Sequence, residues 1–189
     1  MAKTKGPTVF VQKKKWVTIV SPALFNEKEI GETHLTEIKD AIGRKVSVSL
    51  MTLTGDPQKQ SIYVQFLIKN AVGEKLLTEI VGWELLPSAA RKLMRRSRSK
   101  IEDSYVVQTE DGKKLRIKPL LITRSRAKGG VVARIRHELK LNIEKILAKT
   151  KYEQFIRDLV TKKFQRTLAD GLKKIYPVAV LEIRMFRLV

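Results

Sequence analysis

The stretch that decides the fold is residues 115–146, which reads LRIKPLLITRSRAKGGVVARIRHELKLNIEKI. Its first part alternates, so that Arg116 and Lys118 lie on the strand face opposite Leu115 and Ile117. After a basic loop the apolar residues recur instead at a period of about 3.6, which is typical of an amphipathic helix. A strand that leads into a long helix therefore predicts a mixed sheet-and-helix protein.

The long helix carries one apolar stripe, formed by Val132, Ile135, Leu139, Ile143 and Ile146. These residues are spaced by three and four, so they fall on one face. A helix with a single apolar face must bury it against another element, and the preceding strands are the available partner. We therefore expect the helices to pack on one side of a sheet.

Outward from this stretch, the same two periods define the remaining elements. Strands are expected at 16–20, 46–53, 61–69, 75–84, 105–109, 115–122 and 179–185, and helices at 87–100, 132–146, 152–160 and 164–175. The Asp-Gly pair at 111–112 predicts a hairpin turn. The sequence thus predicts the α+β class, with an antiparallel curled or barrel-like sheet and helices packed on one side. We expect a basic extended tail over 1–15 and a single domain over 16–189.

Composition excludes several classes of protein. The 189 residues include no cysteine, which rules out disulfide scaffolds, iron–sulfur clusters and thiol nucleophiles. Hydrophobic residues make up 43%, enough for a folded core. No apolar run approaches the roughly 18–20 residues of a spanning helix, and the first ten residues lack the apolar stretch of a signal peptide. We expect a cytoplasmic protein that does not associate with a membrane.

The net charge of +20 is unevenly distributed. Residues 1–15 carry five lysines and no acid, whereas residues 16–90 carry seven basic and nine acidic residues. Residues 91–136 then carry fifteen basic residues against four acidic ones, and residues 137–189 carry twelve against six. This localisation is typical of a face that binds a polyanion, and nucleic acid is the commonest such partner.

Three basic segments and one strand face supply the candidate RNA-binding residues. Arginine suits phosphate because its planar fork donates two hydrogen bonds, and a Gly-Gly entry to a helix exposes backbone N–H groups. Each segment also has an alternative interpretation without RNA. Residues 91–100 could be a solvated charged face, residues 124–136 an ordinary loop with a helix cap, and the lysine tail a segment that only increases solubility. The candidates are Lys13, Lys14 and Lys15; Arg91, Lys92, Arg95, Arg96, Arg98 and Lys100; Arg116 and Lys118; and Arg124, Arg126, Lys128, Arg134 and Arg136.

Catalysis is not indicated. The ten glycines form no phosphate-binding or nucleophile-elbow motif, and the two histidines are isolated. The pairs Glu102-Asp103 and Glu110-Asp111 are the only candidates for a metal nuclease, but adjacent carboxylates on a strand point to opposite faces. We therefore predict no enzyme, no metal and no cofactor.

Readout of base identity is also weakly supported. Aromatic residues make up only 6%, and Trp16, Trp83 and Tyr105 lie in predicted strands, where we expect them in the core. Phosphate and shape recognition of structured RNA fits this composition better than reading of a DNA sequence. A non-ribosomal RNA chaperone or a DNA-compacting protein is the alternative.

The order of several short blocks along nearly the whole chain resembles the S3Ae family of small-subunit ribosomal proteins. The blocks are Lys15-Trp16, Pro22, Phe25, Ile30-Gly31-Glu32-Thr33, Gly43-Arg44, Ser49-Leu50, Leu53-Thr54-Gly55-Asp56, Arg95 to Ile101, Thr109 to Gly112, Leu115 to Pro119, Ile175-Tyr176-Pro177 and Leu181 to Arg184. The compact length resembles archaeal members. The resemblance implies a structural constituent of the small ribosomal subunit that binds rRNA on the platform, beside other ribosomal proteins and the mRNA exit region.

Overall fold

A computed structural model describes residues 14–189. The strands are β1 (Lys15–Val20), β2 (Glu29–Leu35), β3 (Lys45–Ser49), β4 (Ile62–Val72), β5 (Lys75–Leu85), β6 (Lys100–Glu102), β7 (Tyr105–Gln108), β8 (Lys114–Thr123) and β9 (Val178–Leu188). The α-helices are α1 (Leu50–Thr54), α2 (Pro87–Leu93), α3 (Gly129–Leu147), α4 (Tyr152–Val160) and α5 (Lys163–Lys173). Short 3-10 turns are η1 (Ala23–Phe25), η2 (Ile38–Ala41) and η3 (Pro57–Lys59). The α+β class is confirmed.

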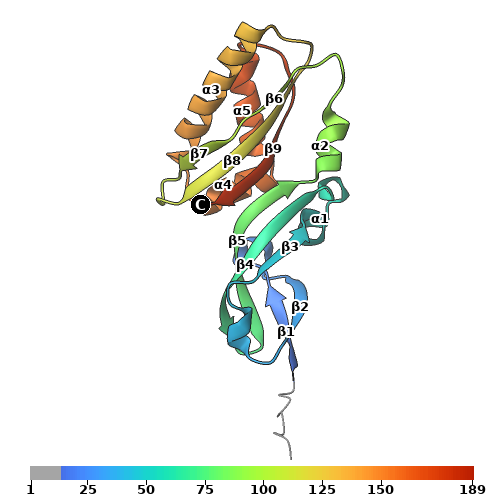
Figure 1. The fold of residues 1–189 in the computed structure, drawn as a ribbon. Coiled ribbons are helices and arrows are strands. Elements are labelled where there is room, and N and C mark those ends of the chain that lie inside the picture. The colour runs from blue at the N-terminus through green and yellow to red at the C-terminus, as the bar shows by residue number, and fades with distance from the viewer. Residues whose placement is uncertain (1–13) are drawn as a thin grey trace, which may run out of the picture.

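The nine strands form one continuous, open sheet built around the long strand β5. One edge of β5 pairs with β4, which in turn pairs with β3. Along its other edge β5 pairs first with β1 and then with β9, and β9 continues to β8. The sheet curls but does not close, so of the two predicted forms, curled or barrel-like, the structure has the curled one (Figure 1).

The sheet contains one parallel pair, in contrast to the predicted antiparallel sheet. Strand β1 runs parallel to β5, with Thr18 opposite Lys75 and Val20 opposite Leu77. All other strand pairs are antiparallel. Strand β1 lies on the edge of β5 opposite β4 and runs in the same direction as β5, while its antiparallel partner β2 lies on its other side.

Two hairpins follow from glycines with positive φ. Gly73 has φ +61 in the tight turn that joins β4 to β5, and Gly112 has φ +76 in the turn that joins β7 to β8. L-residues with a Cβ rarely adopt this backbone conformation. The hairpin predicted at Asp111-Gly112 is therefore present.

Helices α3, α4 and α5 cover one face of the β8–β9 part of the sheet (Figure 1). The predicted stripe of α3 is buried at Ile135, Leu139 and Ile143, each with no exposed surface. Facing them, β8 and β9 contribute Ile117 and Phe186, which are equally buried. This packing forms the main core and leaves the opposite face of the sheet open.

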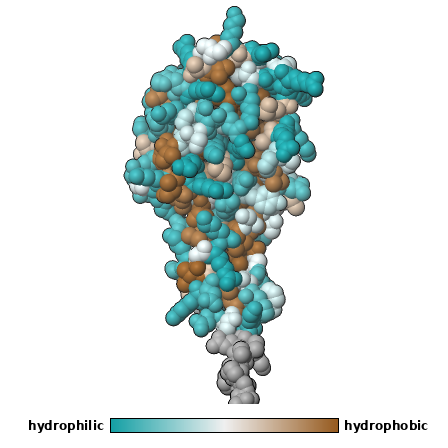
Figure 2. Space-filling model, viewed as in Figure 1, coloured by the Kyte–Doolittle hydropathy of each residue, from teal (hydrophilic) through white to brown (hydrophobic). Residues whose placement is uncertain are grey.

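A second, smaller core lies at the β1–β2 end. It contains Val17 and Ile19 of β1, Leu35 of β2, and Ile68 and Leu76 from the β4–β5 hairpin. The two cores lie at successive positions along β4 and β5, which gives the molecule an elongated form (Figures 1 and 2).

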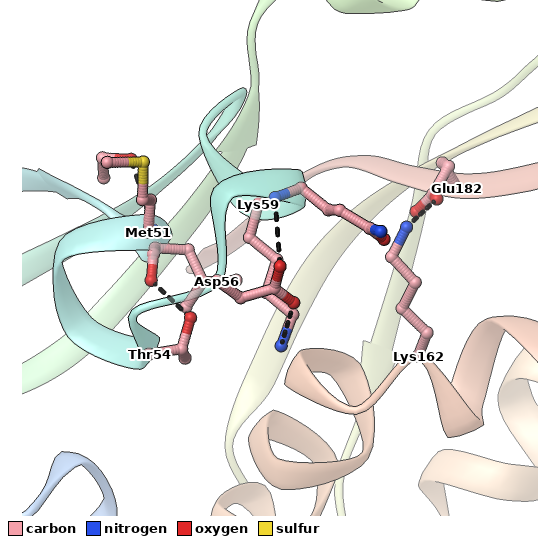
Figure 3. A network of polar contacts seen from close by, with 9 residues as sticks. Met51, Thr54, Asp56, Lys59, Lys162 and Glu182 are labelled. Carbon is pink, nitrogen blue, oxygen red and sulfur yellow. Dashed lines mark hydrogen bonds and ion pairs between the residues drawn. The ribbon is translucent and has the colours of Figure 1, made fainter.

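The connection from α4 to α5 is tied to the sheet by one ion pair. Lys162 has φ +60, and its Nζ lies 2.8 Å from Oε1 of Glu182 on β9 (Figure 3). Figure 3 also shows the pair between Asp56 and Lys59 at the turn of η3. Of these two pairs, the Lys162–Glu182 pair is the one that fixes the helix layer relative to the strands.

Three local predictions are wrong. Residues 50–53 form a helix rather than a strand, because Ser49 caps it by accepting a hydrogen bond from the N–H of Met51 at 3.3 Å. Helix α2 ends at Leu93 instead of continuing to Lys100. Strand β2 was not predicted, because its mostly polar, exposed residues show no apolar alternation.

Candidate nucleic-acid interface

The two arginine-rich segments, residues 91–98 and 124–134, are separated by 25 residues in the sequence and meet at one end of the molecule through a polar clamp. Thr123 closes β8 and is fully buried. Its Oγ1 accepts a hydrogen bond from the N–H of Ser99 at 2.9 Å, and its own N–H donates to the carbonyl of Ser99 at 3.0 Å. The Ser99 hydroxyl in turn accepts from the N–H of Ala127 at 3.0 Å. The clamp places residues 94–99 directly beside residues 124–128.

The second basic segment is also held from its other side. The hydroxyl of Tyr176 lies 2.8 Å from the hydroxyl of Ser125 and donates to the carbonyl of Arg126 at 3.2 Å. The N–H of Arg124 donates to the carbonyl of Pro177 at 3.0 Å. The loop backbone is therefore fixed, while the side chains of Arg124 and Arg126 remain exposed.

We call this end the arginine tip. It comprises residues 91–98 and 124–134 and lies at the top of Figure 1, where α2 leads into the connection to β6 and where α3 begins. Its predicted site residues are Arg91, Lys92, Arg95, Arg96, Arg98, Arg124, Arg126, Lys128 and Arg134, all exposed except Arg98, which is partly buried. Within residues 14–189 none of them forms an ion pair with an acid. These cations are available to an external anion.

Two predicted site residues are already paired with acids. Nζ of Lys100 lies 2.5 Å from Oε2 of Glu102, and Nε of Arg136 lies 3.3 Å from Oδ2 of Asp103. Glu102 also contacts Arg184 of β9. The carboxylates of Glu102 and Asp103, which were considered and rejected as metal ligands on the sequence alone, thus serve as partners of cations. Among residues 14–189, no group of three His or acidic residues is arranged to hold a metal.

The acidic pair in the β7–β8 hairpin has a structural role as well. Oδ2 of Asp111 accepts a hydrogen bond from the N–H of Tyr152 at 2.8 Å, which caps the start of α4 from a distant turn. The Tyr152 hydroxyl crosses the core and donates to the carbonyl of Ile80 at 2.6 Å. Burial, with a smaller effect of Glu79, raises the pKa of the Tyr152 phenol, so it stays protonated and able to donate.

Lys14 and Lys15, the last two residues of the predicted basic tail, lie at the opposite end of the molecule from the arginine tip. Lys14 precedes β1 and Lys15 is its first residue, and both are exposed. Figure 1 shows β1 and β2 at the bottom of the molecule. Lys13 and the rest of the predicted tail lie outside the described residues. The structure therefore brings two of the predicted basic segments together and places Lys14 and Lys15 at the other end of the molecule.

Arg116 and Lys118 lie on the open face of the sheet, as their alternation predicted. The strand register extends this face into a row, because Arg116 is opposite Arg187 of β9, which is opposite Gly82 of β5, which is opposite Gln65 of β4. Aligned residues on paired strands point to the same face. A polar row therefore crosses four strands on the side away from the helices.

A groove of about 610 Å³ runs beside this row. The sequence did not identify its cations as site residues, although the alternation in β8 already placed one of them, Lys114, on the same face as Arg116. The others come together only through strand register. The cations that line the groove are Lys45, Lys69, Lys113, Lys114 and Arg187.

Glu79 is the single acidic side chain in the groove lining. Its carboxylate contacts Lys69, and its Oε1 lies 2.7 Å from Nζ of Lys113. Burial alone would raise the pKa of Glu79, but the hydrogen bonds and charges of Lys113 and Lys69 outweigh it and lower the pKa below its ordinary value. Glu79 is therefore ionised at neutral pH, and it holds both lysines at the groove.

Two further expectations concern the aromatic residues and the membrane. Trp83 is 2% exposed and lies in the core as predicted, whereas Trp16 is 66% exposed, so its predicted burial is wrong. Tyr105 is partly buried and donates a hydrogen bond to Oδ2 of Asp103 at 3.1 Å.

Across residues 14–189, every helix is too short or too polar to cross a bilayer.

Comparison with known proteins decides the family. The model of the Ribosomal S3Ae family matches residues 4–189. The chain belongs to the ribosomal S3Ae family. The S3Ae resemblance of the short sequence blocks is thus confirmed over nearly the whole chain.

Two archaeal ribosomal proteins are similar to this S3Ae member over most of its length. The chain is 33% identical over 172 residues to the small ribosomal subunit protein eS1 of Methanothermobacter thermautotrophicus, covering 91% of this chain and 88% of that one. It is 34% identical over 175 residues to the small ribosomal subunit protein eS1 of Sulfurisphaera tokodaii, covering 93% and 91%. The match to the family model, over residues 4–189, includes both arginine segments and every described strand.

Proposed function

We propose that the chain is a non-catalytic constituent of the small ribosomal subunit that binds rRNA through phosphate and shape recognition. The observation that carries the proposal is the arginine tip, where two basic segments are clamped side by side with no acidic partner among the described residues. Fixed arginine forks match phosphate oxygens, and they recognise no particular base. The names of the relatives support the ribosomal setting.

The partners follow from the same proposal. Residues 16–189 act as a single RNA-binding domain, with small-subunit rRNA at the arginine tip and a second RNA segment along the open sheet face. Neighbouring small-subunit proteins bind the remaining surface. The family resemblance implies a position on the platform of a cytoplasmic ribosome, near the mRNA exit region, so that mRNA passes close to the chain.

The decisive experiment reverses two charges at the tip. The double variant Arg95→Glu, Arg96→Glu changes exposed side chains that form no ion pair in residues 14–189, so the fold is retained. We expect its affinity for small-subunit rRNA to fall by at least about tenfold, since each charged contact is worth roughly 1 kcal/mol or more. Filter binding measures the affinity, and thermal unfolding checks the fold.

A matched control changes the net charge equally at a different surface. Lys163 and Arg166 are exposed on α5, on the helix side of the molecule, and neither forms an ion pair among the described residues. The double variant Lys163→Glu, Arg166→Glu is therefore expected to bind rRNA within about twofold of the unaltered chain, a small effect of long-range charge only. Equal losses in both variants would show that net charge alone governs binding, and would contradict a specific tip.

The non-ribosomal alternative is tested in the cell extract. A subunit constituent migrates with small subunits through a sucrose gradient, whereas an RNA chaperone or a DNA-compacting protein is found elsewhere. We expect co-migration with small subunits that persists at the salt concentration at which loosely bound proteins dissociate. Recovery only in the free or DNA-bound fraction would overturn the ribosomal part of the proposal.

A further inference from the structure

Trp16 is the feature of the molecule that phosphate recognition leaves unexplained. It lies in β1, where its neighbour Val17 and the next inward residue, Ile19, are each 3% exposed in the small core. Strand alternation therefore points Trp16 away from that core, and 66% of its surface is exposed. Trp16 is the second residue of β1, before the part of that strand that pairs with β5, so among the described residues its only strand neighbour is β2 and its ring is accessible to a ligand.

The ring of Trp16 is held in one orientation by His34. The two residues are direct partners in the antiparallel β1–β2 pair. Their rings are stacked, with centroids 4.8 Å apart and planes inclined by 19°. Because His34 occupies one side of the indole, the exposed area of Trp16 belongs to its other side and its edges. The strand pair thus presents a flat aromatic surface whose orientation is already fixed.

The surroundings of this ring are polar. The register places Thr18 and Glu32 beside Trp16 and His34 on the same face, followed by Lys75 of β5. A site for a protein partner ordinarily has a contiguous apolar centre. A single aromatic platform within polar side chains instead suits a flat, polar-edged ligand such as a nucleobase.

Cationic side chains lie immediately beside the platform. Lys14 and Lys15 precede Trp16 in the chain, and both are exposed. Lysine is a flexible point charge that reaches phosphate oxygens without a fixed geometry. By strand alternation Lys14 shares the side of Trp16, whereas Lys15 begins on the side of Val17, so a phosphate flanking a base stacked on Trp16 would lie within reach of Lys14.

We propose that Trp16, supported by His34, is a stacking platform for an unpaired base of RNA, with Lys14 binding an adjacent phosphate. This inference rests on the proposed RNA-binding function and adds a second contact of a different kind at the far end of the molecule. The platform is tolerant of base identity, because every base has a π face. The arginine tip binds folded RNA, and the platform at the other end of the molecule binds an unpaired nucleotide.

Tryptophan fluorescence tests the platform directly. The chain has two tryptophans, and Trp83 is 2% exposed in the core, so ligand-induced quenching reports Trp16. The probes are a short oligoadenylate and an abasic oligomer of the same length, which carries the same phosphates but no bases. We expect the oligoadenylate to quench the intact protein with a saturable curve and the abasic oligomer to leave the emission nearly unchanged.

Three variants measure the contribution of the ring. Trp16→Ala removes the platform, and its affinity for oligoadenylate is expected to fall by about 5- to 150-fold, the range for loss of one base–aromatic stack. Trp16→Phe keeps a ring and should retain part of the affinity. Thr18→Ala, on the same face of the same strand, should bind as the unaltered protein does. Anisotropy of a labelled oligomer gives these affinities without relying on Trp16 emission.

The proposal is overturned if the abasic oligomer quenches as strongly as oligoadenylate, or if Trp16→Ala binds oligoadenylate with unchanged affinity. Trp16→Ala that binds RNA normally but fails to enter reconstituted small subunits would instead assign Trp16 to a protein neighbour. The tip variants separate these outcomes from the proposed function, because rRNA binding that depends on Arg95 and Arg96 stands even when the platform fails.

Discussion

At the scale of single residues, the arginine tip depends on one buried hydroxyl. Thr123 Oγ1 accepts from the N–H of Ser99 and lies 2.6 Å from the carbonyl of Ser125, so it joins both basic segments. Thr123→Val keeps the shape and removes these bonds. We expect a loss of about 1–3 kcal/mol in the free energy of unfolding, because the Ser99 N–H is left without its partner. Urea denaturation measures the loss.

A threonine elsewhere provides the control for this change. The hydroxyl of Thr167 on α5 is exposed and bonds only to the carbonyl of Lys163 in its own helix, at 3.0 Å. Thr167→Val should therefore change stability by no more than about 0.5 kcal/mol. If Thr123→Val is equally mild, the clamp does not hold the two segments together, and we would then expect its rRNA affinity to be unchanged as well.

Glu79 gives the molecule a defined dependence on pH. Lys113 and Lys69 lower the pKa of Glu79 in the folded state below its ordinary value of 4.5. The carboxylate therefore stabilises the fold above that pH, and this contribution is lost as the pH falls through the folded-state pKa. We expect Glu79→Gln to unfold at a lower temperature than the unaltered protein at pH 7, and the difference to shrink below about pH 4.5.

An exposed acid without a cation shows whether this effect is specific. Glu37 precedes η2 and forms no ion pair within residues 14–189. Glu37→Gln should leave the melting temperature nearly unchanged at pH 7. A pH-independent difference for Glu79→Gln would mean that packing, and not the charge on Glu79, accounts for its effect.

Residue-level predictions from the sequence were limited by one ambiguity. Alternation shows that Trp16 and Val17 lie on opposite faces of β1, but it does not show which face is buried. Val17 is buried because β2 and the β4–β5 hairpin close a small core against that face, and these contacts are remote in sequence. Trp83 lies in the core as its place in a predicted strand suggested, and both of its neighbours in register, Val64 and Phe186, are apolar and buried.

At the scale of elements, α3 anchors the helix layer to the sheet. Leu139 lies at the middle of its apolar stripe and has no exposed surface. Leu139→Asp places an unpaired charge in the main core, so we expect a loss of at least about 3–5 kcal/mol, enough to unfold a marginally stable domain. Circular dichroism on heating detects this. Lys140→Asp, on the exposed side of the same turn, should remain folded, and a folded Leu139→Asp would show that α3 faces elsewhere.

The elements that the sequence predicted share a strong local pattern. The long helix, the β4–β5 meander and the β7–β8 hairpin each combine a clear period with a glycine or a cap. The errors occur where a distant contact overrides the local pattern. Helix α2 ends early because Ser99 pairs with Thr123, and an extended backbone there replaces further helical turns.

At the scale of the whole molecule, the order of strands could not be obtained from the sequence. The register that aligns Arg187 with Arg116 joins residues 71 positions apart and follows three helices. No local period encodes such a pairing. The sequence therefore identified Arg116 and Lys118 and missed the lysines that share their face, although it did locate the region of highest charge, which became the arginine tip.

The salt dependence of rRNA binding measures how many of these cations act together. Neutralising about 8–10 phosphates makes log K fall against log salt with a slope near −6 to −9, since each phosphate contributes about 0.7–0.9. Because nine cations of the arginine tip lack acidic partners among the described residues, we expect a slope in this range. Arg95→Glu, Arg96→Glu should reduce its magnitude by about 1–2, and Lys163→Glu, Arg166→Glu should leave it unchanged. A slope shallower than about −2 for the unaltered chain would mean that RNA phosphates are not its main contact, whatever its affinity.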